Sequence, residues 1–282
     1  MINFPIAIVL YNPPNSAIER ILNFLTKGLV FYIFDNSKTK NEILSHSDNS
    51  NLSYYSFEKN FGLSYSINYI CEKAIQDNNK NLLFFDQDTI FKIESLTYIH
   101  NFLVDKENDN SGFFGDVLSV NFRDSESSQN DINIIETGIF KSYFYYSVYF
   151  NINSGTLYFL DHFKKFKWFE EQYFVDGVDY SLSLNTIINN LHNIVIVNVP
   201  GLNHKDEQGD SEIQFLGRKI SGRAYPLSRN YDFLKSHMQL LLKSLKIKSF
   251  KPKLFIIRAM FSYSASQFIF RVKDLFAKTN KT

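Results

Sequence analysis

The chain has 282 residues, a formal net charge of +1 and 44% hydrophobic residues, which suffice for one large domain or for one domain with an appendage. Its one cysteine, Cys71, excludes an intramolecular disulfide and fits a reducing compartment. The amino terminus, MINFPIAIVLYNPP, has no leading basic cluster and too short an apolar run for a signal peptide, so we expect a cytoplasmic protein.

The first part of the chain alternates short apolar runs with helical patterns. Strands are predicted at 5–11 (PIAIVLY), 29–37 (LVFYIFDNS) and 81–89 (NLLFFDQDT), and a weaker one at 52–57 (LSYYSF). Between them, apolar residues recur at helical spacing from Ala17 to Leu25 and from Leu63 to Ala74, where Cys71 is expected to be a buried thiol. This alternation predicts an α/β fold with a parallel sheet, whose ligand groups lie at the carboxyl ends of the strands.

The middle of the chain is less regular. It predicts a strand in 111–123, a polar loop at 124–131, aromatic-rich antiparallel strands within 132–160, a helix after Asp179, a strand at 194–200 and a loop at 201–211. From about Ser228 onward the pattern is helical with basic flanks. We therefore predict a domain at 1–227 and a basic helical extension at 228–282.

Two carboxylates, Asp86 and Asp88, follow the apolar run LLFF with one residue between them. Adjacent like charges repel and raise each other's pKa, so the pair is costly unless a cation lies between them. Mg²⁺ and Mn²⁺ prefer oxygen ligands, usually one or two carboxylates plus substrate phosphates. The motif indicates a site for a metal and a diphosphate, although Asp-x-Asp also caps turns.

Polar residues at two other element ends leave two interpretations open. Asp35 could accept hydrogen bonds from a nucleotide, or it could form an Asx-turn with Asn36 and Ser37. Asn60 and Gly62 precede a helix whose first N–H groups could meet a phosphate, or they could simply cap it.

Two further acidic residues, Asp176 and Asp179, lie three apart in YFVDGVDYSL. In a partly apolar site the pKa of Asp179 would rise toward that of a general base, whereas its structural role would be negative charge at a helix amino end. In the loop beyond, His204 is a candidate third metal ligand or a solvated side chain.

A basic stretch, GRKISGRAYPLSRNYDF, gathers guanidinium groups that match phosphate oxygens, and its candidates are Arg218, Lys219, Arg223 and Arg229. A surface that binds nucleic acid would use the same positive charges. The sequence has no RNP, helix-turn-helix or zinc pattern, so we expect no nucleic-acid partner.

Taken in order, several segments together resemble the family-2 glycosyltransferases with the GT-A fold, most closely the rhamnosyltransferase-like branch that acts on bacterial surface polysaccharides. The segments, which span roughly residues 5–231, are IAIVLYNPP, FYIFDNS, NFGLSYSIN, LLFFDQDT, NSGTLYFL, YFVDGVDYSL, the loop around His204 and RAYPLSRN. The resemblance implies a mixed, mainly parallel sheet flanked by helices, with a basic helical extension.

The resemblance also assigns roles to individual residues. Donor-binding residues would be Tyr11, Asp35, Asn60, Gly62, Asp86, Gln87, Arg223, Tyr225 and Arg229, with Asp35 at the nucleotide base. Mg²⁺ or Mn²⁺ would be bound by Asp86, Asp88 and His204. Asp179 would be the catalytic base, and Ser154, Gly155 and Asp176 would contact the acceptor. The chain departs from the family after Asp179, where YSLSLN replaces the usual acidic residue and later arginine, and it matches the loop at 201–204 only loosely.

The implied reaction is inverting transfer of a sugar, such as rhamnose or galactofuranose, from a UDP- or dTDP-linked donor to a glycan or lipid-linked acceptor. A nucleotidyltransferase is an alternative, but it normally needs a glycine-rich basic loop that PIAIVLYNPPNS does not supply. A non-catalytic carbohydrate-binding module would explain the aromatic residues but not the carboxylates at several strand ends.

The carboxyl-terminal part is strongly basic, because residues 217–282 hold 15 Lys or Arg and only two acidic residues, Asp232 and Asp274. Within it, residues 254–270 are apolar and aromatic, but the run is too short and too interrupted to span a bilayer. Two interpretations of this segment stay open. In the first, the helix lies on an anionic membrane surface, as a peripheral contact at the inner membrane. In the second, it packs on the catalytic domain or on another subunit of a homo-oligomer.

Overall fold

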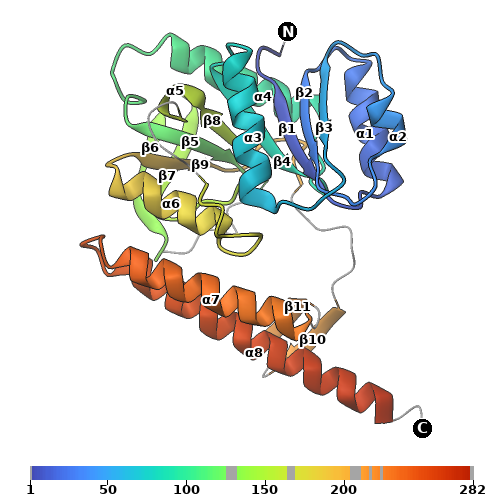
Figure 1. The fold of residues 1–282 in the computed structure, drawn as a ribbon. Helices are drawn as coiled ribbons and strands as arrows, with labels where there is room; N and C mark the ends of the chain where they lie inside the picture. The colour runs from blue at the N-terminus through green and yellow to red at the C-terminus, as the bar shows by residue number, and fades with distance from the viewer. Residues whose placement is uncertain are drawn as a thin grey trace. The chain divides into compact units, whose positions relative to one another are not determined.

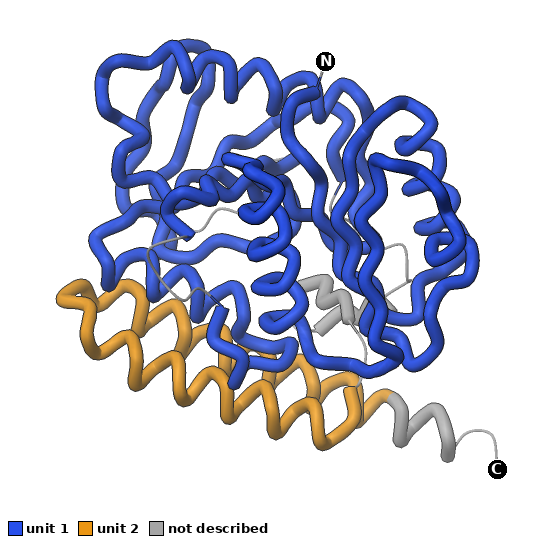
Figure 2. The backbone as a smooth tube through the Cα atoms, turned by 45° about the horizontal axis from the view of Figure 1, so that its top comes forward, with its two compact units in different colours: residues 1–205 blue, residues 206–282 orange. Residues whose placement is uncertain are grey.

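The computed structural model describes residues 2–124, 132–163, 169–203, 211–215, 218–222 and 225–279. The chain divides into two compact units, unit 1 (Met1–Lys205) and unit 2 (Asp206–Thr282), which Figure 2 shows in different colours. Our predicted boundary at 227/228 lies further along the chain than this division.

Unit 1 is built on a nine-stranded sheet in the order β3-β2-β1-β4-β8-β5-β9-β7-β6 (Figure 1). The strands are β1 (Ile6–Leu10), β2 (Phe31–Asp35), β3 (Leu52–Ser56), β4 (Asn81–Asp86), β5 (Val117–Phe122), β6 (Ile134–Phe140), β7 (Tyr143–Val148), β8 (Thr156–Phe159) and β9 (His192–Ile196). The pairings make β7 and β8 antiparallel to the other strands of this sheet. The predicted mixed, mainly parallel α/β architecture is confirmed.

Helices cover both faces of this sheet because residues of alternate parity on each strand point to opposite faces. They are α1 (Asn15–Leu25), α2 (Glu42–Ser45), α3 (Leu63–Gln76), α4 (Ile93–Glu107), α5 (Leu160–Phe163) and α6 (Val178–Ile188). Ile6 and Ile8 of β1 belong to the core cluster that contains Ile18 of α1 and Ile99 of α4. The helix α3 contacts β1 and β2 and buries Cys71, as predicted, while α6 contacts β9.

The crossover helices place the ends of the strands where the sequence led us to expect them. Asp35 is the last residue of β2 and Asp86 is the last residue of β4, and these two strands lie on either side of β1 in parallel. Their carboxyl ends therefore share one edge of the sheet. The helix α4 follows this edge and was not among the predicted elements.

Unit 2 consists of the hairpin β10 (Ser211–Phe215) and β11 (Arg218–Gly222) followed by α7 (Leu227–Ser244) and α8 (Lys251–Thr279). The helices confirm the expected pattern after Ser228, whereas the hairpin was not predicted. The ring of Phe233 in α7 stacks on the ring of Tyr263 in α8, with 3.7 Å between the ring centres. The Tyr263 hydroxyl donates a hydrogen bond to Asn230 Oδ1 at 2.9 Å. Within the part of the chain that the structure describes, no helix has the length and apolar content to span a bilayer.

Candidate active site

Asp86 and Asp88 lie at the carboxyl end of β4, where solvent reaches both side chains. The Asp86 N–H donates to Ser154 Oγ at 3.1 Å, and the Ser154 hydroxyl lies 2.6 Å from Thr89 Oγ1. Surrounding protein atoms, followed by the negative charges of Asp179 and Asp88, raise the pKa of Asp86 to about 7. The Asp86 carboxylate is thus open to solvent on one side and partly desolvated by the protein on the other.

The first turn of α6 supplies the third acidic side chain, Asp179. The Asn153 N–H donates to its carboxylate, while the next residue, Ser154, accepts from the Asp86 N–H. The Tyr158 hydroxyl of β8 fixes this segment by donating to Asn153 Oδ1 at 2.6 Å. Two consecutive residues thus hold Asp86 and Asp179 next to each other, although their elements lie far apart in the sequence.

The electrostatic surroundings of Asp179 favour proton exchange near neutral pH. Burial raises the pKa of Asp179 to about 7, against the opposing effects of the Asn153 hydrogen bond and the positive charge of Arg123. A carboxylate with such a pKa can take a proton from a hydroxyl in the physiological range.

The buried cation beside Asp179 is Arg123, which follows β5 and was not identified from the sequence. Its Nε donates to Asn121 Oδ1 at 2.7 Å, and Asn121 Nδ2 in turn donates to Ser154 O at 2.7 Å. Burial lowers the pKa of Arg123 to about 10, so the guanidinium is charged at neutral pH. The signal that could have found Arg123 is a charged residue directly after the strand VLSVNF, the same pattern that singled out Asp35.

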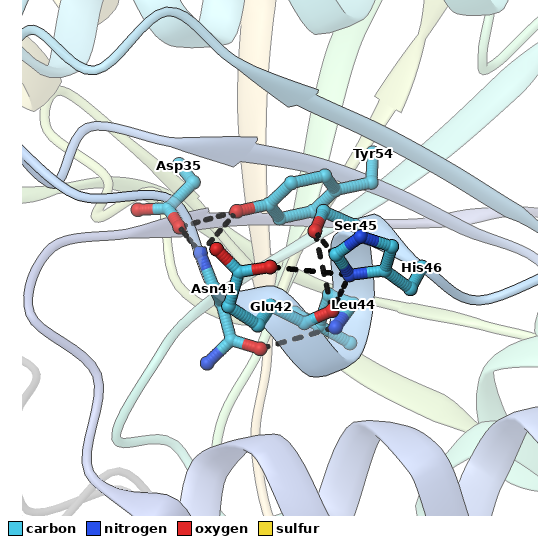
Figure 3. Close-up of polar contacts among 7 residues, drawn as sticks. All are labelled: Asp35, Asn41, Glu42, Leu44, Ser45, His46 and Tyr54. Atoms are coloured by element: carbon cyan, nitrogen blue, oxygen red, sulfur yellow. Dashed lines mark hydrogen bonds and ion pairs between the residues drawn. The ribbon is translucent and has the colours of Figure 1, made fainter.

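Asp35 is fully buried and its carboxylate is engaged inside the protein (Figure 3). Ser37 N donates to Oδ1 at 2.9 Å, which agrees with the Asx-turn interpretation, and the Tyr54 hydroxyl donates to Oδ2 at 2.6 Å. Asn41 N also donates to Oδ2, at 3.3 Å. These bonds fix the loop between β2 and α2.

Tyr11 and Gln87 connect the ends of β1 and β4 at the same edge of the sheet. The Tyr11 N–H donates to Gln87 Oε1 at 2.9 Å, and Gln87 Nε2 donates to Tyr11 O at 3.3 Å. Arg20 of α1 donates to the Gln87 carbonyl at 2.7 Å. The Tyr11 ring is about half exposed and is thus available to a ligand.

The start of α3 uses its backbone donors within the protein, in agreement with the capping interpretation. The Gly62 N–H donates to Asn60 Oδ1 at 2.9 Å, and the Leu63 N–H donates to Phe174 O at 2.7 Å. The loop that carries Phe174 leads into α6, so this contact joins α3 to the segment that presents Asp179.

Replacing Gly62 with alanine is expected to destabilise the protein by about 3 kcal/mol. Gly62 has φ +84°, and an added Cβ would lie 2.6 Å from Phe174 Cδ2 and 2.9 Å from Phe174 O. Gly28→Ala is the matched control, since Gly28 has φ +77° but no atom within 4 Å of a Cβ, and it should cost only about 1 kcal/mol. Thermal unfolding of both variants measures this difference, and equal losses would contradict the steric argument.

The remaining predicted site residues are distributed over both units. Ser154 and Gly155 are buried, and the backbone of Gly155 bridges Phe84 of β4 and Phe122 of β5 with two bonds of 2.8 Å. Asp176 is half-buried in the loop before α6. In unit 2 the Arg229 guanidinium lies 4.1 Å from the centre of the Tyr225 ring. His204 and Arg223 lie outside the described residues.

The side chains at the end of β4 match the chemistry of a hard divalent cation. Among the described residues, no group of three or more His, Cys, Asp or Glu side chains could hold a metal ion by itself. Asp86 and Asp88 nevertheless form a two-carboxylate set, which suffices for Mg²⁺ or Mn²⁺ when substrate phosphates complete the coordination. The repulsion that raises the pKa of Asp86 would be relieved by such an ion.

Asp86→Asn is expected to stabilise the metal-free protein at pH 8 by about 1 kcal/mol, and to have little effect at pH 5. Because the folded state raises the pKa of Asp86 from 3.8 to about 7, it binds more protons than the unfolded chain between these values. The stability of the wild type therefore falls as pH rises through this window, although solvent around Asp86 makes the change smaller. Thermal unfolding in EDTA at pH 5 and pH 8 measures the stability difference between the variant and the wild type. A variant less stable than the wild type at pH 8 would contradict the charge repulsion.

Comparison with family models gives a match over most of unit 1. The model of the family described as "Glycosyl transferase family 2" matches residues 6–166, more than half of the chain. That range contains the ends of β1, β2 and β4 and the segment Asn153–Ser154 that positions the two acids. Among curated proteins the comparison finds no sequence match.

Among solved structures, the fold is similar to that of S. aureus TarS, with a TM-score of 0.54 and 14% identity over 92% of this chain and 43% of that chain. A structure of S. aureus TarS 1-349 gives a TM-score of 0.55 and 14% identity, over 94% of this chain and 73% of that one. The chain thus spans less than half of the longer TarS structure, and at this identity the likeness establishes the fold alone. On the family match over residues 6–166, the chain belongs to glycosyl transferase family 2.

Proposed function

We propose that this chain is an inverting glycosyltransferase that moves a sugar from a nucleoside-diphosphate donor to a hydroxyl of a bacterial surface glycan or lipid-linked acceptor. The observation that carries the proposal is that the consecutive residues Asn153 and Ser154 hydrogen-bond to Asp179 and Asp86 and so hold the two acids close together. One acid lies at the strand end beside Asp88, and the other has the pKa of a general base.

In this mechanism Asp179 accepts the proton of the acceptor hydroxyl as its oxygen attacks the anomeric carbon. Asn153 and Tyr158 hold the carboxylate in place, and Arg123 keeps part of the Asp179 population ionised at neutral pH by opposing the effect of burial. Attack on the face opposite the diphosphate breaks the bond between the anomeric carbon and the diphosphate oxygen, which inverts the anomeric carbon and releases the nucleoside diphosphate, while Asp179 keeps the acceptor proton.

Asp86 and Asp88 would hold Mg²⁺ or Mn²⁺, which when bound supplies positive charge to the diphosphate leaving group. Tyr11 and Gln87 lie at the same edge and would contact the donor, while Asp35, Asn60 and Gly62 would shape its pocket by fixing the neighbouring loops. Asp176 precedes α6 on the loop nearest to Asp179, which supports an acceptor contact, and Ser154 and Gly155 would position the acids. His204, Arg223, Tyr225 and Arg229 are proposed at the diphosphate or acceptor.

A screen of UDP- and dTDP-linked sugars for thermal stabilisation tests the proposal and needs no acceptor. A ligand that binds only the folded state at about 100 times its dissociation constant adds about 2.7 kcal/mol of stability. The correct donor should raise the melting temperature with Mn²⁺ and much less with EDTA. Absence of stabilisation by every nucleotide sugar, with and without Mn²⁺, would contradict donor binding.

Product analysis separates the proposal from its alternatives. A nucleotidyltransferase would release pyrophosphate from a nucleoside triphosphate and a sugar phosphate, and a binding module would leave every nucleotide sugar intact. Slow hydrolysis of one nucleotide sugar to nucleoside diphosphate and free sugar is the outcome that supports a glycosyltransferase.

A further inference from the structure

Unit 2 exposes far more apolar surface than its size requires. It contributes ten of the 21 large apolar side chains that are exposed in the described part of the chain, although it is much the smaller unit. Two of the most exposed are phenylalanines of α8, Phe261 and Phe268, at 74% and 69%. Exposed apolar side chains at this density mark an interaction surface.

One face of α8 combines these aromatic residues with positive charge. Leu254, Phe261 and Phe268 recur at every seventh residue, and the positions that alternate with them on the same face are Lys251, Arg258 and Ala265. All six are exposed. We call these six residues the outer face of α8.

The opposite side of α8 is already occupied by contacts within unit 2. Tyr263 stacks on Phe233 of α7, the Tyr225 N–H donates to Gln267 Oε1 at 2.8 Å, and Arg271 donates to the Tyr225 carbonyl at 2.6 Å. These contacts hold α8 against α7 and against the segment before α7. The outer face of α8 is therefore not needed to fold unit 2.

We propose that the outer face of α8 binds the surface of an anionic lipid bilayer. Phe261, Phe268 and Leu254 enter the boundary between headgroups and acyl chains, while Lys251 and Arg258 pair with lipid phosphates. The helix does not cross the bilayer, in line with the absence of a spanning helix among the described residues.

Charge favours this occupant over a second copy of the chain. Two copies packed through the outer face would place Lys251 and Arg258 in the seam of the helix pair, where like charges repel. The surroundings offer little compensation, because Asp232 and Asp274 are the only acidic residues in 217–282. An anionic membrane supplies the missing negative charge along the whole helix.

Vesicle flotation of the full chain tests the proposal. The protein should float with phosphatidylcholine vesicles that contain phosphatidylglycerol at low salt, less at high salt, and least with phosphatidylcholine alone. Phe261→Ser combined with Phe268→Ser should weaken partitioning by at least about tenfold, and Lys251→Gln combined with Arg258→Gln by about fivefold per cation.

Matched controls lie on unit 1. Ile139→Ser combined with Phe144→Ser removes apolar side chains exposed at 73% and 42%, and Lys27→Gln combined with Lys80→Gln removes two exposed cations. Both control pairs should bind vesicles like the wild type, and circular dichroism should show a folded protein for every variant, because all the substituted side chains are exposed.

Three results would overturn the proposal. The first is failure of the wild type to bind phosphatidylglycerol vesicles at low salt, and the second is equal binding by the Phe261/Phe268 variant and its control. The third is a wild-type dimer in sedimentation experiments that becomes a monomer in this variant while neither protein binds vesicles, which would assign the outer face to a second copy. None of these results depends on the proposed transfer reaction, which is assayed separately with soluble donor.

Discussion

Asp179→Asn is expected to lower the turnover number for sugar transfer by about 10³-fold while leaving donor affinity nearly unchanged. The asparagine keeps the shape of the side chain and an oxygen for the Asn153 N–H, but it cannot accept the proton of the acceptor. Single-turnover rates measure the loss, and isothermal titration with the donor measures binding. An asparagine variant with full turnover would remove Asp179 from the catalytic role.

The control for this variant is Asp176→Asn, three residues earlier in the loop that precedes α6. It removes the same charge, but Asp176 is proposed only as an acceptor contact, so its main effect should be a higher KM for the acceptor. In the wild type the rate should rise with pH through about 7, because Asp179 must lose its proton before it can act as the base.

Asp88→Ala is expected to weaken Mn²⁺-dependent donor binding by about 100-fold or more, since loss of even an outer-shell partner of a metal typically costs 10–100-fold. The structural reason is that Asp86 and Asp88 form the two-carboxylate set at the end of β4. Titration of the donor in Mn²⁺ measures the effect, and unchanged affinity would exclude Asp88 from the metal.

The same titration in EDTA distinguishes metal binding from general electrostatics. Without the ion, Asp88 only repels the diphosphate, so the alanine variant should bind the donor slightly better than the wild type. Asp48→Ala is the control for charge alone, because Asp48 is exposed on a loop distant in sequence from the site. It should change donor affinity in neither condition.

The strands β1 to β4 and the helices α1 and α3 of unit 1 follow closely from local patterns, whereas α4 was not predicted. Runs such as IAIVL and FYIFD are apolar over the length of a buried strand, and the helix of Cys71 shows one apolar face, so burial alone selects their structure. The β10–β11 hairpin escaped prediction because RKISG carries two cations and no clear alternation, so its basic residues suggested a phosphate contact instead.

The sequence by itself determined that acidic residues end buried strands, because the alternation of strands and helices dictates a parallel sheet with its loops at one edge. Only the tertiary structure decided which of them meet. Asp86 and Asp179 come together through Asn153 and Ser154, Arg123 supplies the neighbouring positive charge, and Asp35 turns inward to Tyr54. Such contacts depend on strand order and register between distant segments, which local periodicity does not encode.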